Sequence, residues 1–366
     1  MIFRLVKLCS LILFMICASV SIVAQHEGHV DDAHGDQGHS EKFVAGKYIF
    51  HHIADANEIH FFGNVSIPLP IILYTEGEGF DVFLSNLFQT KTGGYDTHYD
   101  MYAEGPRTGT GFVKLKDGKI TAVDENKGVW DISITKSIFG MFCMMALILF
   151  LMSKVARSYA KNPGKAPSGL TNFLEPLILF VVNDIAVPCL GKERADKFLP
   201  FLLTVFFFIT ASNFLGLIPF IGGFNITGTI GVTIVLATTV FIITTFKGNK
   251  HYWGHMFNPP GVPFIVKFLV VPIEISQIFI KPIVLMIRLT ANISAGHIII
   301  LSFVSLIYIF SNQGEAVGTG VAVGVFSTLF MIFMYLLEFL FAFLQAYVFT
   351  LLAAIYFADA TQEATH

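Results

Sequence analysis

The longest apolar stretch of the chain, from Phe264 to Phe310, predicts a helix embedded in a membrane. At about 1.5 Å per residue this helix would be about 70 Å long, more than twice the thickness of a hydrocarbon core. It therefore has to be steeply tilted, bent or broken. Pro272 and Pro282 offer places to bend, because each removes a backbone hydrogen-bond donor.

This stretch carries charged residues at depths from which lipid should exclude them. Four positions recur every seven residues, a step that returns nearly to the same face of a helix. They are Glu274, Lys281, Arg288 and Ala295. A charged side chain at a bilayer centre costs about 2.5–3.5 kcal/mol on insertion scales. We therefore expect one polar stripe of this helix to face a partner, a water cavity or an ion path.

A second long apolar stretch, Gly320 to Phe357, contains a single formal charge. Five of its residues step by three or four positions and so share one helix face: Tyr335, Glu338, Ala342, Gln345 and Phe349. We interpret the two stretches as consecutive, tilted, antiparallel helices, each with a polar stripe. His297 on the first helix and Glu338 on the second form the natural pair between them, because titratable groups of opposite type can share a proton or a water chain.

Shorter apolar stretches predict the rest of an all-α, multi-pass membrane protein. Spans are expected at Ile132–Met152, Phe198–Phe220 and Ile226–Phe246. Polar residues interrupt Thr171–Leu190, which we expect to lie along the cytoplasmic interface. With the two long helices this makes about five crossings. The basic residues after the first span put the N-terminus outside and the C-terminus in the cytoplasm by the positive-inside rule.

The chain begins with a pattern typical of a secretory signal peptide, residues 1–24. Arg4 and Lys7 precede an apolar segment, and Ile22-Val23-Ala24 offers a cleavage site before Gln25. The alternative is an uncleaved first membrane helix, although the apolar segment is short for a span. In either case we expect the following residues to lie outside.

Two further segments precede the first span. Residues 25–42 are polar and contain four histidines among acidic residues. Such runs can bind zinc or copper, but no fixed ligand spacing is present, so we interpret the segment as a solvated linker without a metal site. Residues 43–130 alternate short β-branched or aromatic runs with turn residues, which predicts a small extracytoplasmic β-rich domain ahead of a membrane domain at 131–361. The expected strands and hairpin turn are Glu58–Val65, Ile67–Tyr74, Gly111–Leu115, Ile120–Val123 and the turn Lys116–Lys119.

Composition agrees with a membrane protein and excludes several other classes. The 366 residues are 54% hydrophobic and 13% charged, about half the usual charged share. The net charge of −3 gives no reason to expect nucleic acid as a partner. The four cysteines show no disulfide framework and no zinc spacing. Neither a catalytic constellation nor a cofactor motif is present.

The polar residues of the long helices allow structural and functional readings. A buried arginine can pair with a carboxylate, but Glu274 lies fourteen residues from Arg288, about 21 Å along a helix. Since Glu338 already has His297 as a candidate partner, we favour an unpaired, functional Arg288. Glu274 is either a channel residue or a water-facing one near the cytoplasmic end.

The remaining polar residues of the stripes are equally open. Lys281 is interpreted as interfacial. Asn292 and Gln345 can hold the two helices together or hold water in a path.

Three motifs, in order along the chain, resemble subunit a of F-type ATP synthases. The first is Ile287-Arg288-Leu289-Thr290-Ala291-Asn292-Ile293-Ser294-Ala295-Gly296-His297. The others are Leu344-Gln345-Ala346-Tyr347-Val348-Phe349-Thr350-Leu351-Leu352 and Ser212-Asn213-Phe214-Leu215-Gly216-Leu217-Ile218-Pro219. The resemblance covers residues 132–361 and leaves out the leader and the β-rich segment, which look like an extension found in part of the family.

The resemblance implies a non-catalytic stator subunit in a bacterial inner membrane, beside a rotating c-subunit ring and the b subunits of a peripheral stalk. Arg288 matches the family's essential arginine. The positions that match the two aqueous half-channels are Glu274, Asn292, His297, Glu338 and Gln345. The best-known bacterial pattern has Glu where this chain has His297 and His where it has Glu338; the order here is similar to that of mitochondrial homologues.

Two other function classes stay open at this point. A self-contained secondary transporter or channel would carry its ion path within the chain, but such proteins often have two related halves, and no internal repeat is present. A sensor that binds metal through the exported histidines would leave Arg288, His297 and Glu338 without a role. The choice between H⁺ and Na⁺ as coupling ion does not follow from this sequence.

Overall fold

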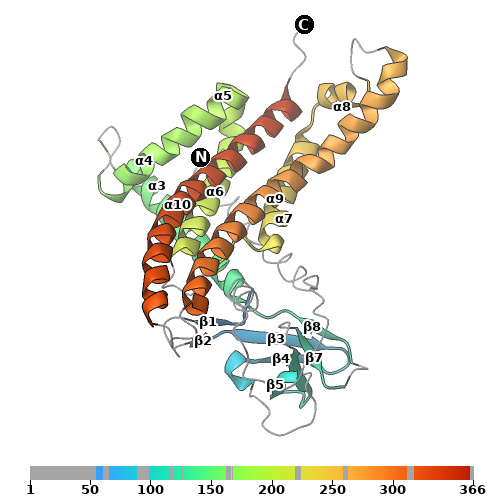
Figure 1. Ribbon diagram of the computed structural model, residues 1–366. Helices are drawn as coiled ribbons and strands as arrows, with labels where there is room; N and C mark the ends of the chain where they lie inside the picture. The colour runs from blue at the N-terminus through green and yellow to red at the C-terminus, as the bar shows by residue number, and fades with distance from the viewer. Residues whose placement is uncertain are drawn as a thin grey trace.

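The computed structural model describes residues 55–60, 66–88, 99–115, 119–124, 127–161, 166, 168–218, 224–258, 263–310 and 317–362. The predicted leader, the histidine-bearing segment 25–42 and residues 116–118 of the expected turn lie outside these ranges and stay predictions. Figure 1 shows a bundle of long helices above a smaller body of β-strands.

The strands lie in the N-terminal part of the described chain, which confirms the predicted β-rich region. They are β1 (Glu58–His60), β2 (Ser66–Pro68), β3 (Pro70–Thr75), β4 (Gly79–Leu84), β5 (Tyr99–Glu104), β6 (Gly111–Leu115), β7 (Ile120–Ala122) and β8 (Val129–Asp131), with a 3₁₀ turn at Ser85–Leu87. They form a β1-β2 pair and two three-stranded sheets, β4-β3-β8 and β5-β6-β7, in which every pairing is antiparallel.

The two three-stranded sheets bury their alternate residues against a shared core. In β3 every second side chain is buried, as the period of two of a strand requires. Phe83 of β4 and Phe112 of β6 meet in this core with ring centroids 6.2 Å apart. Ile71 and Leu73 are fully enclosed beside them.

The sequence located some of these strands and missed others. Gly111–Leu115 is β6 as predicted, and β7 begins at the predicted Ile120 and pairs with β6 as a hairpin. The predicted run Ile67–Tyr74 is wrong as one strand, because the chain breaks at Leu69, whose N–H bonds to the carbonyl of Asn57. In the run Glu58–Val65 the described strand ends at His60.

A buried carboxylate links β4 to the loop between β5 and β6. Asp81 has no exposed surface. Its Oδ1 accepts hydrogen bonds from the backbone N–H of Arg107 (2.9 Å) and of Thr108 (3.1 Å), and its Oδ2 accepts the Thr108 hydroxyl. Gly105 leaves the room this carboxylate needs, because a Cβ there would overlap it. The loop is thus fixed by charge-assisted bonds.

The helices fill the rest of the described chain. They are α3 (Lys136–Lys161), α4 (Leu170–Phe180), a π-helical turn at Val181–Ala186, α5 (Val187–Leu190), α6 (Lys192–Leu217), α7 (Ile230–Lys247), α8 (Lys250–Phe257), α9 (Phe264–Phe310) and α10 (Val317–Thr361). Six segments of the described residues are long and apolar enough to cross a membrane: α3, the unit from α4 to α5, α6, α7, α9 and α10.

Hydrogen bonds between helix ends define two ends of the bundle. At the sheet end, the Thr229 hydroxyl before α7 donates to the Ser137 hydroxyl at the start of α3 (3.2 Å). At the opposite end, the N–H of Asn249 after α7 donates to the carbonyl of Ala360 in α10 (2.9 Å). The helices α3 and α7 therefore both run away from the sheets.

The unit from α4 to α5 begins and ends at the end opposite the sheets. It follows the far end of α3, where the Tyr159 hydroxyl donates to Glu175 of α4 (2.5 Å). It leads into α6 at Arg194, whose guanidinium donates to the carbonyl of Thr361 in α10 (3.1 Å). A segment that joins two points at the same end does not cross, so the geometry agrees with the predicted interfacial position and with five crossings, although the unit is apolar enough to span.

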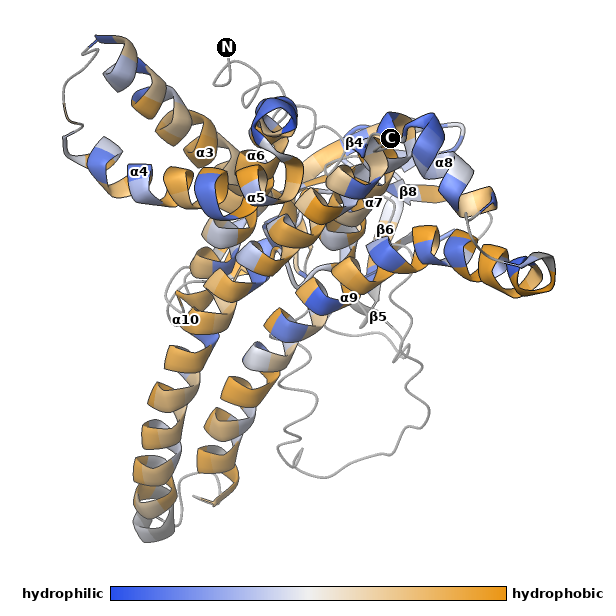
Figure 2. Cartoon of the chain, turned by 90° about the horizontal axis from the view of Figure 1, so that it is seen from above, coloured by the Kyte–Doolittle hydropathy of each residue, from blue (hydrophilic) through white to orange (hydrophobic). Residues whose placement is uncertain are grey.

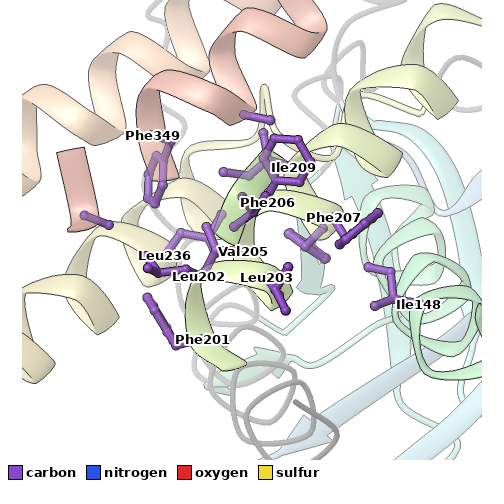
Figure 3. Packing of buried hydrophobic residues seen from close by; sticks show 14 of the residues in the cluster. Ile148, Phe201, Leu202, Leu203, Val205, Phe206, Phe207, Ile209, Leu236 and Phe349 are labelled. Atoms are coloured by element: carbon purple, nitrogen blue, oxygen red, sulfur yellow. The ribbon is translucent and has the colours of Figure 1, made fainter. Parts of the chain in front are cut away.

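Helix α6 is the centre of the bundle. Figure 3 shows its Leu202, Val205 and Phe206 packed among side chains of the neighbouring helices, with Phe349 of α10 and Leu236 of α7 beside them. Several hydroxyl side chains inside the bundle bond to carbonyls of their own helices; Thr204, for example, donates to the carbonyl of Pro200 (2.7 Å). Such bonds remove the need for water in the apolar layer.

The two long predicted helices are confirmed and form an outer layer. Helix α9 has 47 residues and α10 has 45, and α9 stays one continuous helix through Pro272 and Pro282. The alternatives of a break at either proline are therefore wrong. Figure 2 shows hydrophilic positions along the otherwise hydrophobic α9, which lies beside α10.

We expect Asp81→Ala to destabilise the β-strand region by about 3 kcal/mol, because it removes charge-assisted hydrogen bonds worth about 1.5–3 kcal/mol each and leaves part-buried donors unpaired. The measurement is urea unfolding of the detergent-purified protein, followed by Trp130 fluorescence in a Trp253→Phe background. Glu104→Ala, at an exposed position of β5, is the control and should shift the midpoint little. Equal shifts for both variants would contradict the role of Asp81.

Candidate functional site

The antiparallel helices α9 and α10 bring the predicted polar stripes together. The Asn292 amide donates to Oε1 of Gln345 across the two helices (3.0 Å). Nearer the end opposite the sheets, the Lys281 ammonium lies 3.8 Å from a carboxylate oxygen of Asp359. This hydrogen bond joins the two helices, and the role of Asn292 and Gln345 in holding water in a path stays a prediction.

Arg288 lies on the same stripe, one turn before Asn292, and its side chain is exposed. Within the described residues its guanidinium makes no hydrogen bond and no ion pair. The structural reading, an ion pair with Glu274 or Glu338, therefore finds no support. A guanidinium with five donors at this depth requires acceptors supplied from outside this part of the chain.

Glu338 is enclosed between the two helices. Only 6% of its surface is exposed, and its Oε2 is buried without a hydrogen-bond partner in the described residues. The carboxylate packs against Gly296 of α9, where an added Cβ would overlap it. Glycine is needed here for space, since its backbone conformation is helical. A buried carboxylate with an unused acceptor is a place where a proton or a water can be held.

His297 follows Gly296 and points towards α6. A Cβ on Gly216 would lie 3.6 Å from its Nε2. No direct hydrogen bond or ion pair joins His297 to Glu338 among the described residues. The Glu338 carboxylate nevertheless packs against Gly296, the residue next to His297 in the chain. The predicted pairing through a water chain stays a prediction.

Sequence reasoning gave no role to the polar groups of α6 beside this pair. The Asn213 amide donates to the carbonyl of Ala342, one turn after Glu338 (3.0 Å), and its Oδ1 accepts the Thr227 hydroxyl (2.5 Å). The Ser212 hydroxyl is buried without a partner in the described part of the chain. Two adjacent polar residues inside an apolar span are the signal that could have identified them.

Glu274 and Lys281 lie towards the end of α9 opposite the sheets. Glu274 is half-buried, and its carboxylate interacts electrostatically with the hydroxyl of Tyr252 on α8. The Lys281 ammonium lies 5.0 Å from the ring centroid of Tyr356 and near Asp359, so it is held by partners, and its interfacial position stays a prediction.

A small cavity of about 20 Å³ lies beside Lys281 between α7, α8, α9 and α10. It has room for one water. Its lining residues are Val240, Phe241, Thr244, Thr245, Tyr252, Ile278, Lys281, Pro282 and Tyr356.

The site therefore has two separate polar regions on either side of Arg288. One contains His297 and Glu338 on the side of the sheets, and the other contains Glu274 and Lys281 on the opposite side. No group of three or more metal-ligating side chains was found in the described part of the chain.

Comparison with known proteins identifies similarity over nearly the whole chain. Residues 138–358 match the family described as ATP synthase A chain, and residues 48–137 match a Domain of unknown function (DUF8433). The chain is 42% identical to ATP synthase subunit a 2 of Chlorobaculum tepidum over 238 residues, which cover 63% of this chain and 64% of that relative. It is 33% identical to ATP synthase subunit a of Chlorobium phaeobacteroides over 357 residues, 95% of this chain and 85% of the relative.

We expect Gly296→Ala to destabilise the protein, because the added methyl group overlaps the Glu338 carboxylate and overpacking costs about 1–3 kcal/mol. Gly324→Ala is the matched control on α10, where a Cβ meets only Ile307 at 3.9 Å. That variant should be neutral or stabilising, since Ala favours helix by about 0.5–1 kcal/mol. The measurement is the thermal unfolding midpoint in detergent.

A double variant tests whether Glu338 is the cause. The penalty of Gly296→Ala should disappear in a Glu338→Ala background, because the overlapping atoms are gone. A penalty of the same size in both backgrounds would show that Ala at this position disturbs something other than Glu338.

Proposed function

Because the chain belongs to the ATP synthase A chain family, we propose that it is the stator subunit of the membrane sector of an F-type ATP synthase. In this role it supplies two aqueous half-channels and an essential arginine that couple proton movement to rotation of the c-subunit ring. The observation that carries the proposal is Arg288, an exposed charge on an apolar helix that makes no hydrogen bond or ion pair within the described residues. A ring carboxylate is the partner of complementary charge.

Arg288 acts as a fixed positive barrier between the half-channels. Its guanidinium does not lose its proton at usable pH. A ring carboxylate that passes it is held ionised, whereas one that enters lipid has to be neutral, because charge in hydrocarbon is too costly. Protons therefore travel with the ring rather than directly past Arg288.

The two polar regions supply the half-channels. His297 and Glu338 lie on the side of the β-strands, which we assign to the outside of the inner membrane. Glu274 lies towards the opposite, cytoplasmic side, next to α8 and the small cavity beside Lys281. Asn292 and Gln345 lie between these regions near Arg288, where their mutual hydrogen bond leaves further donors and acceptors for water.

The subunit itself makes and breaks no covalent bonds and requires no cofactor. Each proton that crosses 100 mV releases about 2.3 kcal/mol, which the ring converts to torque. Besides the ring, the expected partners are the b subunits of the peripheral stalk and membrane lipid. The N-terminus is assigned to the periplasm and the C-terminus to the cytoplasm.

The alternative is a self-contained secondary transporter. The exposed position of Arg288 favours the stator, because a transporter would enclose its charged site within its own helices. The two also differ in a simple measurement. Purified protein reconstituted alone should move ions if it is a transporter and should not if it is a stator that needs its ring.

We expect Arg288→Lys to abolish ATP-driven proton pumping while the complex still assembles. Lysine keeps a positive charge but has a compact ammonium that can lose its proton when desolvated, and it lacks the planar set of five donors. Pumping is measured by quenching of a pH-sensitive dye in membrane vesicles, with assembly checked on a native gel. Near-normal pumping by the assembled Lys variant would contradict the proposed mechanism.

Exchange of the pair tests the external half-channel. His297→Glu combined with Glu338→His should retain several-fold more pumping than either single change, because the pair is kept while its members trade helices. The same vesicle assay applies to all three variants. If the double variant loses as much as the singles, the two residues do not act together.

A further inference from the structure

A buried lysine at the start of the first membrane helix has no role in the mechanism above. Lys136 is the first residue of α3, and only 7% of its surface is exposed. Within the described residues its ammonium makes no hydrogen bond and no salt bridge. The groups that interact with its charge are Asp55 and His297.

This position is unfavourable for a lysine in two ways. The side chain is largely enclosed, and a charge held away from most of its water without a hydrogen-bonded partner is unfavourable. The positive end of the helix dipole at an N-terminus adds repulsion instead of stabilisation. A neutral side chain would pack at the start of the helix without these two unfavourable contributions to the free energy. The charge of Lys136 therefore calls for another explanation.

Lys136 lies on a line of polar groups that begins at the surface. Asp55 is exposed, and its Oδ1 accepts the backbone N–H of Ser137 (3.1 Å). The backbone N–H of Lys136 donates to the carbonyl of Ala56 (2.8 Å). The segment at 55–56 thus covers the start of α3, where Lys136 is buried.

Unsatisfied polar atoms lie beside this line. Asn225, before α7, is buried, and its Oδ1 has no partner in the described residues. The Thr229 hydroxyl connects the carbonyl of Asn225 (2.9 Å) to the Ser137 hydroxyl (3.2 Å). Gly216 brings α6 against both the carbonyl of Phe224 and the imidazole of His297. Buried polar groups without protein partners are the places where ordered water is held.

We propose that Asp55 and Lys136 form the entrance of the external half-channel, where they order the water that leads from the surface to His297. This inference rests on the proposed function and adds to it. Lys136 is a positioning residue, since its three N–H donors orient water in the enclosed part of the path. Both residues lie within 48–137, the segment that matches the domain of unknown function, whereas the ATP synthase A chain match begins at residue 138. The N-terminal extension therefore supplies the mouth of the ion path.

Cysteine labelling tests the water path directly. Lys136→Cys is placed in the assembled complex with the chain's other cysteines replaced by serine. A membrane-impermeant thiol reagent should label the introduced thiol from the side of the β-strands only. Lys154→Cys is the matched control in the same helix, eighteen residues or about 27 Å further along, and should be labelled from the opposite side only. A Lys136→Cys variant whose thiol reacts from neither side would overturn the proposal.

Charge rescue tests the role of the ammonium. Lys136→Gln should lower passive proton flow per assembled complex about fivefold or more, and Lys136→Arg should retain most of it. Attachment of a positively charged aminoethyl group to the thiol of the Lys136→Cys variant should restore flow, whereas a neutral group of similar size should not. A structural role would instead lower the amount of assembled complex and leave the flow per complex unchanged, which would overturn the proposal.

The outcomes separate this inference from the proposed function. If Arg288→Lys abolishes pumping while the thiol of the Lys136→Cys variant is unreactive, the stator function stands and the entrance lies elsewhere. If Arg288→Lys pumps normally, the stator mechanism fails whatever is found at Lys136.

Discussion

Hydrocarbon offers no hydrogen bonds, and this constraint decides which residues of the bundle can be structural. Some hydroxyl groups within the spans satisfy it within their own helices: Thr204 and Thr350 donate to the carbonyls four residues earlier. Asn213 meets it across helices, with bonds to Ala342 and Thr227. Arg288 does not meet it within the described residues. The proposed stator role supplies an acceptor for this guanidinium, a carboxylate of the ring that would pack against α9.

The bundle behind α9 and α10 is built as a stiff support. Aromatic and branched side chains of α6 fill its centre, and Phe349 of α10 packs into them (Figure 3). A dense core transmits force with little deformation. The polar bond from Asn213 to Ala342 fixes α10 one turn from Glu338. In the proposed mechanism this support would hold His297 and Glu338 in position while the ring moves past the exposed face of α9.

The sequence predicted the features that are most expensive to place in a membrane, namely charged residues within apolar helices. Charges inside long apolar runs are rare enough that the stripes through Arg288 and Glu338 could be located, together with the antiparallel arrangement that brings Asn292 to Gln345. It left open whether α9 would tilt, bend or break at its prolines, because that depends on neighbours that satisfy the freed backbone groups; a cavity with room for water lies beside Pro282. Nor did it predict that the Glu338 carboxylate packs against Gly296, since this contact depends on the rotation of each helix about its axis.

Sequence reasoning gave no role to Lys136, because the burial of this residue depends on how the β-strand region connects to the first membrane helix. One lysine near the start of an apolar run carries no signal by itself, because its burial depends on Ala56, eighty residues earlier. The sheet does not end in a flexible linker: Ile132 and Ile134 still donate to carbonyls of β3, and Lys136 donates to Ala56 (2.8 Å). Backbone pairing thus continues from β8 to the first residue of α3. A domain needed only outside the membrane could be connected by a loop, whereas one that shapes the first turn of a span has to be held in register with it.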